Sequence, residues 1–542
     1  MRLKAAGLAC LPSFREVWKG LLFFALIHLL IPAYRMEAVA QSTTFNIRSF
    51  EIEGNTLLPG KDILDLLKPF QGTGKTAQDV EKARDALEKM YHDKGYPAVI
   101  VNIPEQSTVG GKIHLQIIES KIGKVRITGN NWYTHEKIMG DLPSLAPGKV
   151  LYVPAVQKDL EHINRGPDFK ASPVLAPGLE PGTTDVEIKV QDELPLHGNL
   201  EINDRNTLHT KDLRLNAMLR YDNLWQRDHS ISVQFQTSPQ DTGQVKMYAL
   251  SYTLPAPWAP DHQIALYGVK SDSNTTVFGQ GLLINGRGTI LGLRYVVPLA
   301  PYAAYAHNIT LGVDFKDFKD STGYLLPGTP GFKTPINYVP LSVSYNASLP
   351  DAWGVTRFSS GMNGSLRGLG SDQETFQEAH YEAGANYIYF TGGVERSQKM
   401  PAGMNMFLKL DGQVADQPLI FHEQYIGGGM MNVRGYREAS ALGDDAVHGT
   451  AELIAPDIGR FLPAGMRIQC TPYAFYDFAW LTIAKPLPSQ VDMSRLQGTG
   501  VGLRGTSRKN MYYEIDYAVP FGYTSQLKQY KQRVYFKMGA QF

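Results

Sequence analysis

The sequence shows almost no excess of charge of either sign, because 53 basic side chains balance 52 acidic ones among its 542 residues. A nucleic acid attracts proteins that carry surplus positive charge, so no nucleic-acid partner is expected. Cysteine is nearly absent, and the only two, Cys10 and Cys470, cannot form a zinc or iron–sulfur ligand set. The 13 histidines show no metal-ligand spacing of the HExxH type. Neither a metal nor a cofactor is therefore expected.

Long apolar runs are also missing, apart from one near the N-terminus. An apolar run at residues 20–33 follows several basic residues and precedes the small residues Ala38, Val39 and Ala40. A run of about fourteen residues is too short for a spanning helix, which needs roughly twenty. We interpret residues 1–40 as a secretory signal peptide cleaved before Gln41, with an uncleaved membrane anchor as the alternative. Because no later stretch of about eighteen apolar residues occurs, the exported chain is expected to be periplasmic, extracellular or a β-barrel.

An internal repeat follows the expected signal peptide. An alternating strand pattern that runs into Gly-Asn occurs at residues 50–55 and again 75 residues later, at residues 125–130. Each copy continues with two helix candidates and two strand candidates in the same order. The helices are expected at residues 62–68, 76–94, 134–142 and 154–165, and the strands at 98–103, 112–119, 169–175 and 184–190. The sequence predicts two α+β domains, 41–120 and 121–193, whose open sheet edges could accept an extended peptide. A pair of structural spacers is the alternative.

The region from residue 194 to residue 542 has a different pattern, with strands of about ten residues that alternate polar and apolar side chains. In the last strand Val534, Phe536 and Met538 alternate with Tyr535 and Lys537. A strand with lipid on one face and water on the other needs this alternation, although a soluble β-sandwich would share it. At roughly twenty to twenty-four residues per strand and loop, the region would close as a transmembrane antiparallel β-barrel of about fourteen to eighteen strands. Other strands are expected at residues 213–221, 230–237, 246–254, 264–269 and 288–297, and long polar segments at 317–337 and 427–445.

The second polar segment contains a glycine-rich motif with one arginine. It reads Tyr-Ile-Gly-Gly-Gly-Met-Met-Asn and ends in Val433, Arg434, Gly435 and Tyr436. An arginine carried into a barrel lumen needs a carboxylate partner, because an unpaired buried charge is costly. The candidate is Asp477, whose neighbours in the chain, such as Tyr476 and Phe478, are apolar and would face lipid, so that Asp477 would point inward. The sequence predicts an Arg434–Asp477 ion pair that holds the loop inside the barrel.

These residues resemble a known family. Val433 to Tyr436, together with Phe475 and Asp477 downstream, resemble the paired signature of the Omp85 superfamily. The two N-terminal repeats make the chain similar to the two-partner secretion transporters (TpsB, or ShlB-type, family) of that superfamily. A further stretch resembles the Gly-Tyr…Pro-Pro-Gln segment in the first POTRA domain of this family and contains Gly95, Tyr96, Pro104 and Gln106.

The resemblance implies two periplasmic POTRA domains, a sixteen-stranded barrel in the outer membrane of a Gram-negative bacterium, and a long loop folded into the lumen. It further implies that Val433–Tyr436 gate the pore, that Asp477, with Phe475, holds the loop, and that the segment from Gly95 to Gln106 takes part in substrate recognition. Three features depart from the family pattern. Ala479 stands where glycine is usual, Glu105 replaces the second proline, and no separate plug helix is visible between Gln41 and the first strand.

Two signals of enzymatic function are absent. Gly72–Lys75 with Thr76 look like a phosphate-binding loop, but Pro69 stands where its first glycine is required, so the segment is better interpreted as a turn before a helix cap at Thr76. No Gly-x-Ser-x-Gly nucleophile motif occurs. The chain is therefore not expected to be an enzyme, which also argues against an outer-membrane lipase.

The function expected from the sequence is export of a large unfolded exoprotein across the outer membrane. The expected partners are the cognate secreted exoprotein, outer-membrane lipid and, for the insertion of the chain itself, the barrel-assembly machinery. Two alternatives remain open. One is an Omp85-type factor that assembles or inserts other outer-membrane proteins, and the other is a passive porin-like channel.

Overall fold

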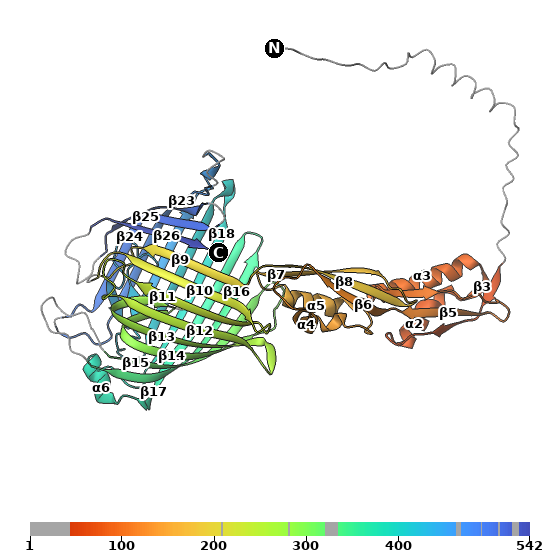
Figure 1. Cartoon of the computed structure of the whole chain (residues 1–542), viewed down its shortest axis with the longest axis horizontal. Coiled ribbons are helices and arrows are strands. Elements are labelled where there is room, and N and C mark those ends of the chain that lie inside the picture. The colour runs from red at the N-terminus through yellow and green to blue at the C-terminus, as the bar shows by residue number, and fades with distance from the viewer. Residues whose placement is uncertain are drawn as a thin grey trace, which may run out of the picture. The chain divides into compact units, whose positions relative to one another are not determined.

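The computed structural model describes residues 44–207, 210–279, 282–319, 334–461, 468–488, 490–507, 510–522 and 531–542 (Figure 1). The expected signal peptide lies outside the described residues. The chain divides into two compact units. Unit 1 comprises Met1–Thr128, Asp141–Ile163 and Ala171–Lys189, and unit 2 comprises Gly129–Gly140, Asn164–Lys170 and Val190–Phe542.

The first repeat is a three-stranded sheet packed against helices. Its elements are β1 (Phe45–Ile47), β2 (Ser49–Glu53), α2 (Gly60–Leu67), η1 (Lys68–Phe70), β3 (Gly72–Lys75), α3 (Ala77–Asp93), β4 (Val99–Asn102) and β5 (Lys112–Glu119). The sheet order is β2-β5-β4, with β2 parallel to β5. Val80 and Leu87 of α3 are buried in one apolar core with Ile113 and Leu115 of β5. Their helical and two-residue spacings put each set on one face, so the sequence pattern accounts for this core.

The segment before α3 is a short strand and then a helix cap. Gly72–Lys75 form β3, which pairs antiparallel with β1, so the prediction of a plain turn is wrong for these residues. A four-residue segment with two glycines has no side-chain alternation that could reveal a strand. The cap is at the predicted position, because the Thr76 backbone N–H donates to the Asp79 carboxylate at 2.9 Å. The hydrogen bonds from the Thr76 backbone and side chain lower the pKa of Asp79, and the capping carboxylate stays ionised.

The second repeat has the topology of the first. Its elements are β6 (Lys121–Thr128), α4 (His135–Asp141), η2 (Pro143–Leu145), α5 (Val153–Ile163), β7 (Phe169–Pro177) and β8 (Thr183–Asp192). The sheet order is β6-β8-β7, with β6 parallel to β8. In both repeats the last strand therefore lies in the middle of the sheet, beside the first. The 75-residue repeat in the sequence corresponds to two copies of one topology.

The repeated Gly-Asn pair has the same structural role in both copies. Gly54 and Gly129 have φ angles of 86° and 88°. A Cβ on Gly54 would lie 2.2 Å from the carbonyl oxygen of Ile117, and a Cβ on Gly129 would lie 2.3 Å from that of Val190. Each following asparagine donates its side-chain N–H to the carbonyl oxygen three residues on. Only glycine satisfies both the left-handed conformation and the close approach to the neighbouring strand.

Sixteen antiparallel strands of unit 2 form a closed barrel in which β26 pairs with β9. The strands are β9 (Leu196–Asn203), β10 (Arg214–Leu224), β11 (His229–Thr237), β12 (Lys246–Ala256), β13 (Ala259–Gly279), β14 (Leu282–Pro298), β15 (Ala306–Phe318), β16 (Ile336–Asp351), β17 (Gly354–Gly370), β18 (Ile388–Lys399), β19 (Asn405–Ala415), β22 (Asp445–Ile454), β23 (Thr471–Thr482), β24 (Met493–Ser507), β25 (Met511–Pro520) and β26 (Arg533–Gln541). Helix α6 (Gln373–Ala379) follows β17, and the short helices η3 (Pro401–Gly403) and η4 (Gly459–Phe461) lie in two other connections. The prediction of a barrel of about sixteen strands is confirmed.

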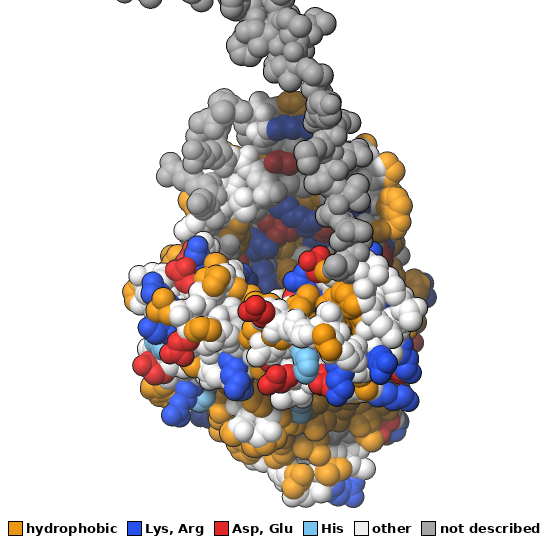
Figure 2. All heavy atoms as spheres, turned by 90° about the vertical axis from the view of Figure 1, so that its right-hand side faces the viewer, with side chains coloured by type: hydrophobic (Ala, Val, Ile, Leu, Met, Phe, Trp, Pro, Cys, Tyr) orange, Lys and Arg blue, Asp and Glu red, His pale blue; other side chains and the backbone are white. Residues whose placement is uncertain are grey.

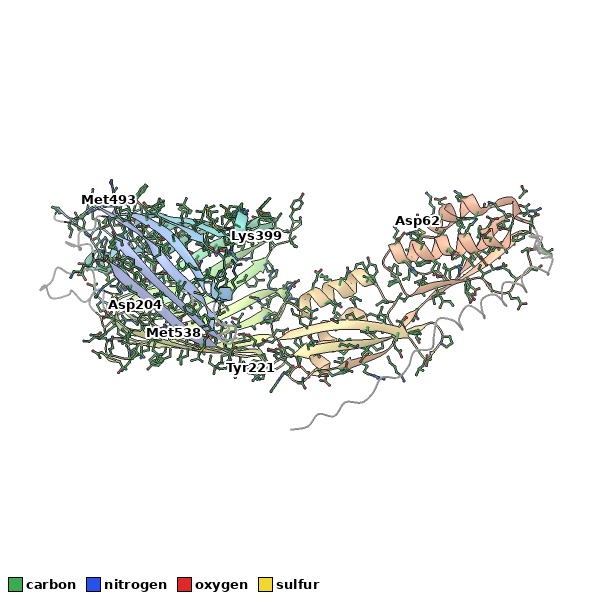
Figure 3. The ribbon with its side chains drawn as sticks, turned by 90° about the horizontal axis from the view of Figure 1, so that it is seen from above. Asp62, Asp204, Tyr221, Lys399, Met493 and Met538 are labelled. Atoms are coloured by element: carbon green, nitrogen blue, oxygen red, sulfur yellow. The ribbon has the colours of Figure 1, made fainter. Side chains whose placement is uncertain are left out.

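The two ends of the barrel differ in their connections. Lys399 lies at the end where β9 begins, called the near end here, and Met493 lies at the far end (Figure 3). Near-end connections such as those after β10 and β16 contain only a few residues, whereas the far end carries α6 and the segment between β19 and β22. Of the two polar segments expected from the sequence, 427–445 belongs to this far-end connection. Most of the other, 317–337, lies outside the described residues.

Inward and outward side chains alternate along the barrel strands. On β23, Tyr476 and Trp480 are 41% and 50% exposed, whereas Asp477 and Ala479 are fully buried. This is the parity expected from the sequence, with apolar side chains outside and the carboxylate inside. On the face of the molecule drawn in Figure 2, basic and acidic side chains are interspersed, in line with the low net charge. Within the described residues no helix has both the length and the apolar character required to cross a membrane.

The repeated glycine gives a first test. We expect Gly54→Ala to destabilise the first repeat by more than about 1–2 kcal/mol, because the left-handed strain adds to the clash with Ile117. The measurement is the urea midpoint for proteolytic cleavage of the N-terminal region in the full-length protein. Gly60→Ala is the matched control, since a Cβ there meets no atom within 4 Å. Equal midpoints for the two variants would contradict the proposed role of the Gly-Asn pair.

Candidate functional site

The connection between β19 and β22, residues 416–444, folds back into the barrel. It contains a small antiparallel pair, β20 (Tyr425–Gly427) with β21 (Ala441–Gly443). Most of its residues are buried or half-buried, including Leu419, Val433 and Asp444, although surface connections are normally exposed. Its side chains contact inward-facing groups on β15, β16, β18, β19, β22, β23 and β25. This connection is called the lumenal loop.

Arg434 of the lumenal loop is paired as the sequence predicts. Its Nε and Nη2 donate to the two carboxylate oxygens of Asp477 at 2.7 and 2.8 Å, and its backbone N–H donates to the same group at 3.1 Å. Its Nη1 donates to Glu452 at 2.7 Å and lies 3.8 Å from Asp516. The guanidinium carbon lies 3.5 Å from the ring centroid of Phe475. Such a fork-shaped group satisfies several fixed acceptors at once, which an ammonium group could not do with the same geometry.

The charges around Arg434 are nearly balanced. Its three carboxylates, Asp477, Glu452 and Asp516, have side chains at most 7% exposed. Arg504 lies 3.0 Å from Glu452 and supplies a second positive charge, and the Tyr473 hydroxyl donates to Asp516. A buried cation with this many charged hydrogen bonds is expensive to disturb, because removal of one partner leaves the others buried and unpaired. Of the carboxylates, the sequence analysis identified only Asp477.

The other residues of the motif seat the loop against the wall. Val433 is fully buried among apolar side chains that include Ala479, the residue at the usual glycine position. The Gly435 N–H donates to the Tyr535 hydroxyl at 2.8 Å, and that hydroxyl donates to the Tyr436 carbonyl oxygen at 2.5 Å. The Tyr436 hydroxyl accepts a hydrogen bond from the Gly522 N–H at 3.0 Å. The structure thus brings all four predicted motif residues together with Phe475 and Asp477.

A row of inward-facing glycines on β24 makes room for the loop. A Cβ on Gly498 would lie 1.9 Å from the carbonyl oxygen of Arg434. At Gly500 and Gly502 a Cβ would collide with the rings of Phe475 and Tyr473, which pack beside the guanidinium. The sequence analysis missed these glycines. Their spacing of two residues was the available signal, since it places all three on one face of a strand.

A second ion pair anchors the beginning of the lumenal loop on another part of the wall. Glu423, whose side chain is 2% exposed, lies 2.6 Å from Nζ of Lys316 on β15. It also accepts hydrogen bonds from the hydroxyls of Tyr338 on β16 at 2.5 Å and Tyr389 on β18 at 2.9 Å. A third ion pair, between Glu438 and Arg205 at 2.9 Å, ties the end of the loop to the segment after β9. The sequence analysis found neither pair, because no local pattern connects residues that lie so far apart in the chain.

Three apolar clusters include residues of the loop. One surrounds Val433, and another contains Met430. The largest includes side chains in and beside β12–β16, of helix α6 and the segment after it, and of the first residues of the lumenal loop: Val245, Met247, Ala249, Val269, Ile290, Phe318, Ile336, Tyr338, Phe376, Ala379, Ala383, Ala385, Tyr387, Leu419 and Ile420. The ring of His422 stacks on Phe318 at 3.7 Å. Part of the lumen is therefore filled by a packed core rather than by water.

Charged side chains lie in the walls of the open parts of the lumen. A cavity of about 580 Å³ is lined by the loop around Arg434 and by charged wall residues such as Lys409, Arg504 and Lys537. A second cavity, of about 860 Å³, is bounded by β13–β19 and Tyr425. The charged groups in these walls favour the presence of water beside the loop.

The expected recognition residues lie around the edge strand β4 of the first repeat. Gly95 accepts a hydrogen bond from the Val153 N–H, and Tyr96 packs on Tyr152 with ring centroids 5.0 Å apart. The Gln106 side chain bonds both backbone groups of His114 on β5, at 2.7 and 2.9 Å. Pro104 precedes it, and its carbonyl oxygen accepts a further bond from Gln106. All four residues are thus engaged within the protein, on either side of β4.

Comparison with known families covers most of the described chain. The model of the POTRA domain, ShlB-type, matches residues 45–120. The model of the haemolysin secretion/activation protein ShlB/FhaC/HecB matches residues 182–314 and 336–505. The outer membrane transporter CdiB of Dickeya dadantii (strain 3937) is 22% identical over 422 residues, which cover 76% of this chain and 73% of that protein.

Solved structures show the same fold. CdiB from Escherichia coli superimposes with a TM-score of 0.63 at 18% identity and covers 99% of this chain and 100% of its own. BamA from Haemophilus ducreyi lacking POTRA domains 1–3 gives a TM-score of 0.53 at 14% identity, covering 92% of this chain and 100% of its own. At these identities the likeness concerns the fold alone.

A closed sixteen-stranded barrel, a POTRA domain and an arginine-bearing lumenal loop define an Omp85-type outer-membrane transporter. The chain belongs to the haemolysin secretion/activation protein ShlB/FhaC/HecB family, whose model covers more than half of its residues. It is an outer-membrane pore that secretes a large exoprotein, and its POTRA region lies in the periplasm. The near end of the barrel is accordingly the periplasmic end.

The fit between loop and wall gives a second test. We expect Gly498→Ala to displace the lumenal loop, because backbone at 1.9 Å cannot move aside as a flexible side chain would. The measurement is protease cleavage within residues 416–444 of the detergent-solubilised protein. Gly392→Ala on β18 is the control, since a Cβ there meets no atom within 4 Å. Protection of the loop in both variants would show that it does not depend on this contact.

Proposed function

We propose that the chain exports one or a few large exoproteins in an unfolded state and that the lumenal loop around Arg434 gates their passage. The observation that carries this proposal is the anchored loop itself. It fills part of the lumen, and three ion pairs hold it to different parts of the wall. An extended polypeptide can pass only after the loop is displaced. The family relationship supplies the class of cargo, a secreted exoprotein.

We further propose that residues 121–193 form a second POTRA domain. The support is the shared strand order of the two repeats and the equivalent roles of Gly54 and Gly129. The two domains would receive the cargo in the periplasm. In the first domain β4 is an edge strand and Ile100 is 55% exposed on it. Addition of an extended segment to this edge is the recognition mode that suits it, with Gly95, Tyr96, Pro104 and Gln106 positioning the strand.

Outer-membrane lipid is the second partner that we propose. Outward-facing strand residues such as Val534 and Val501 are about 60% exposed and apolar. At the periplasmic turns after β10, β12 and β16, Trp225, Trp258 and Trp353 are each nearly 70% exposed, as expected for an aromatic belt at a membrane interface. We also propose that the barrel-assembly machinery inserts the chain into the membrane. The support is strand β26, which ends beside the exposed aromatic residue Phe542. No catalytic step is part of the proposal.

The proposed function is tested by deletion of the gene. We expect the culture supernatant to lose one or a few large proteins while the outer membrane keeps its other barrels. General loss of outer-membrane proteins would instead support an assembly factor. Unchanged secretion, together with a conductance that is open at all times in planar bilayers, would support a passive channel. Either result would overturn the export proposal.

The gating role is tested at Arg434. We expect Arg434→Ala to reduce export at least tenfold, because removal of one partner from a buried ion pair costs about 3–5 kcal/mol. Arg434→Lys should be intermediate, since it keeps the charge but loses the fork-shaped contact with Asp477. Arg434→Asp combined with Asp477→Arg should not restore export, because the reversed loop charge would meet Glu452 and Asp516.

The measurement is cargo in the supernatant at equal levels of folded transporter. Arg396→Ala is the matched control, because Arg396 also pairs with a carboxylate, Asp351, but contacts no residue of the loop among its described partners. Export at the wild-type level in Arg434→Ala and in Asp477→Ala would rule out the gating role.

A further inference from the structure

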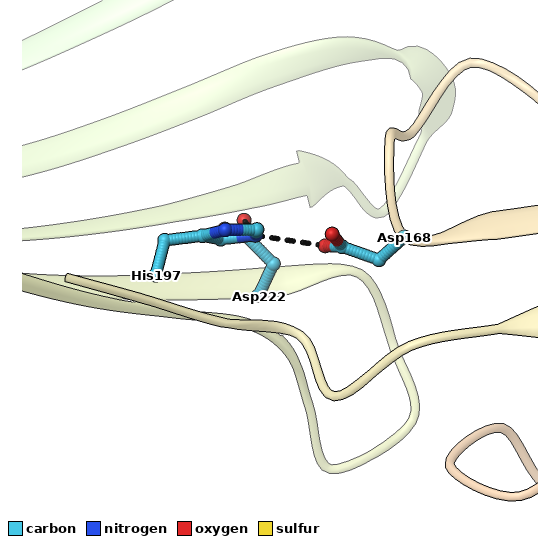
Figure 4. A group of neighbouring side chains, drawn as sticks. All are labelled: Asp168, His197 and Asp222. Carbon is cyan, nitrogen blue, oxygen red and sulfur yellow. Dashed lines mark hydrogen bonds and ion pairs between the residues drawn. The ribbon is translucent and has the colours of Figure 1, made fainter. Parts of the chain in front are cut away.

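Three side chains with metal-ligand chemistry meet beside the first strands of the barrel. Figure 4 shows Asp168, His197 and Asp222 gathered together, with a contact drawn to Asp168. His197 Nε2 is 2.9 Å from Asp168 Oδ2 and 3.4 Å from Asp222 Oδ2. One ligand atom from each residue lies within 4.8 Å of the other two. All three residues belong to unit 2.

The backbone holds these side chains in place. His197 lies on β9 opposite Arg220 of β10, so Asp222 projects from the adjacent strand two residues further on. The Asp222 N–H donates to the Pro195 carbonyl oxygen at 2.8 Å. On the other side, the Asp168 carbonyl oxygen accepts a hydrogen bond from the Glu193 N–H at 2.8 Å. The three side chains are therefore held in place before an ion binds, and this lowers the entropic cost of binding.

The burial of the cluster distinguishes it from ordinary surface carboxylates. The side chain of Asp168 is only 8% exposed, and those of His197 and Asp222 are 24% and 27% exposed. Two carboxylates this close repel each other unless a cation lies between them. Arg220 Nε contacts Oδ2 of Asp222 at 3.0 Å, the same oxygen that faces His197, and holds that carboxylate beside the imidazole.

We propose that Asp168, His197 and Asp222 form a binding site for a divalent transition-metal ion, with Zn²⁺ as the best-fitting ion. A tetrahedral zinc ion with bonds of about 2.0–2.1 Å holds neighbouring ligand atoms roughly 3.3–3.4 Å apart. The 3.4 Å between His197 and Asp222 matches this spacing, and the 2.9 Å hydrogen bond between His197 and Asp168 would have to lengthen by about 0.4 Å to admit the ion. Mixed imidazole and carboxylate donors suit zinc better than magnesium or calcium. Three protein ligands leave the fourth position to water.

The bound ion would join parts of the chain that are otherwise held by hydrogen bonds. Asp168 immediately precedes β7, whereas His197 and Asp222 lie on β9 and at the end of β10. The ion would thus tie residues 164–170 to the first hairpin of the barrel. This inference does not depend on the export proposal. No metal was expected from the sequence, because these three ligands come from separate segments and show no local ligand spacing.

The test is zinc binding to the full-length, untagged protein in detergent micelles after treatment with EDTA and dialysis. Titration calorimetry should show one Zn²⁺ per chain. His197→Ala and Asp168→Asn should each weaken binding more than the roughly 10- to 100-fold that is typical of changes next to a ligand. Co²⁺ in place of Zn²⁺ should give the visible absorption of a tetrahedral ion in the wild type and lose it in both variants.

Asp228→Asn is the matched control, since it removes a nearby carboxylate that pairs with Lys137 and lies outside the cluster. It should bind zinc like the wild type. Folding of each variant is checked by the heat-dependent mobility of the barrel in gels, and His197→Gln replaces His197→Ala if the latter does not fold. No zinc binding by the wild type, or wild-type affinity in the folded His197 variant, would overturn the proposal and leave the cluster as an ion pair only.

Discussion

A positive charge buried inside the barrel is the constraint around which the lumen is organised. The guanidinium of Arg434 can remain there only because Asp477 accepts two of its hydrogen bonds and Glu452 a third. That requirement explains why carboxylates project inward from neighbouring strands, β22, β23 and β25. It also explains the small residues on β24, where Gly498 leaves space for the backbone that carries the charge. The barrel wall and the loop are complementary parts of one site.

The loop is held by charges of alternating sign along its length. Glu423, Arg434 and Glu438 pair with Lys316, Asp477 and Arg205 respectively, so two loop carboxylates meet cations and the arginine between them meets a carboxylate. A loop shifted along the wall would bring like charges together. This alternation gives the loop one favoured position in the lumen. The same wall charges remain available to water once the loop has moved.

Short-period patterns were readable in the sequence, whereas long-range contacts were not. The two-residue period of a strand predicted the inward orientation of Asp477. The Gly-Asn repeat predicted two copies of one topology. Strand β13 was expected over six residues but extends over Ala259–Gly279. Its full length was not predicted, because polar residues such as Lys270 and Asp272 interrupt the apolar alternation. Glu423 pairs with Lys316, which lies 107 residues away in the chain. Such a pair forms only when the barrel closes and brings distant strands together. No local sequence pattern predicts that contact.

The packed cluster formed by Phe376, Tyr338 and Leu419 has a kinetic consequence. Close-packed side chains do not slide gradually, since they are either interlocked or separated. With the gating role proposed above, a loop packed in this way should leave its place in a single cooperative event, much like the unfolding of a small domain. Ionic current through one molecule would then switch between discrete levels with long dwell times. The barrier would depend strongly on temperature, as it does for local unfolding.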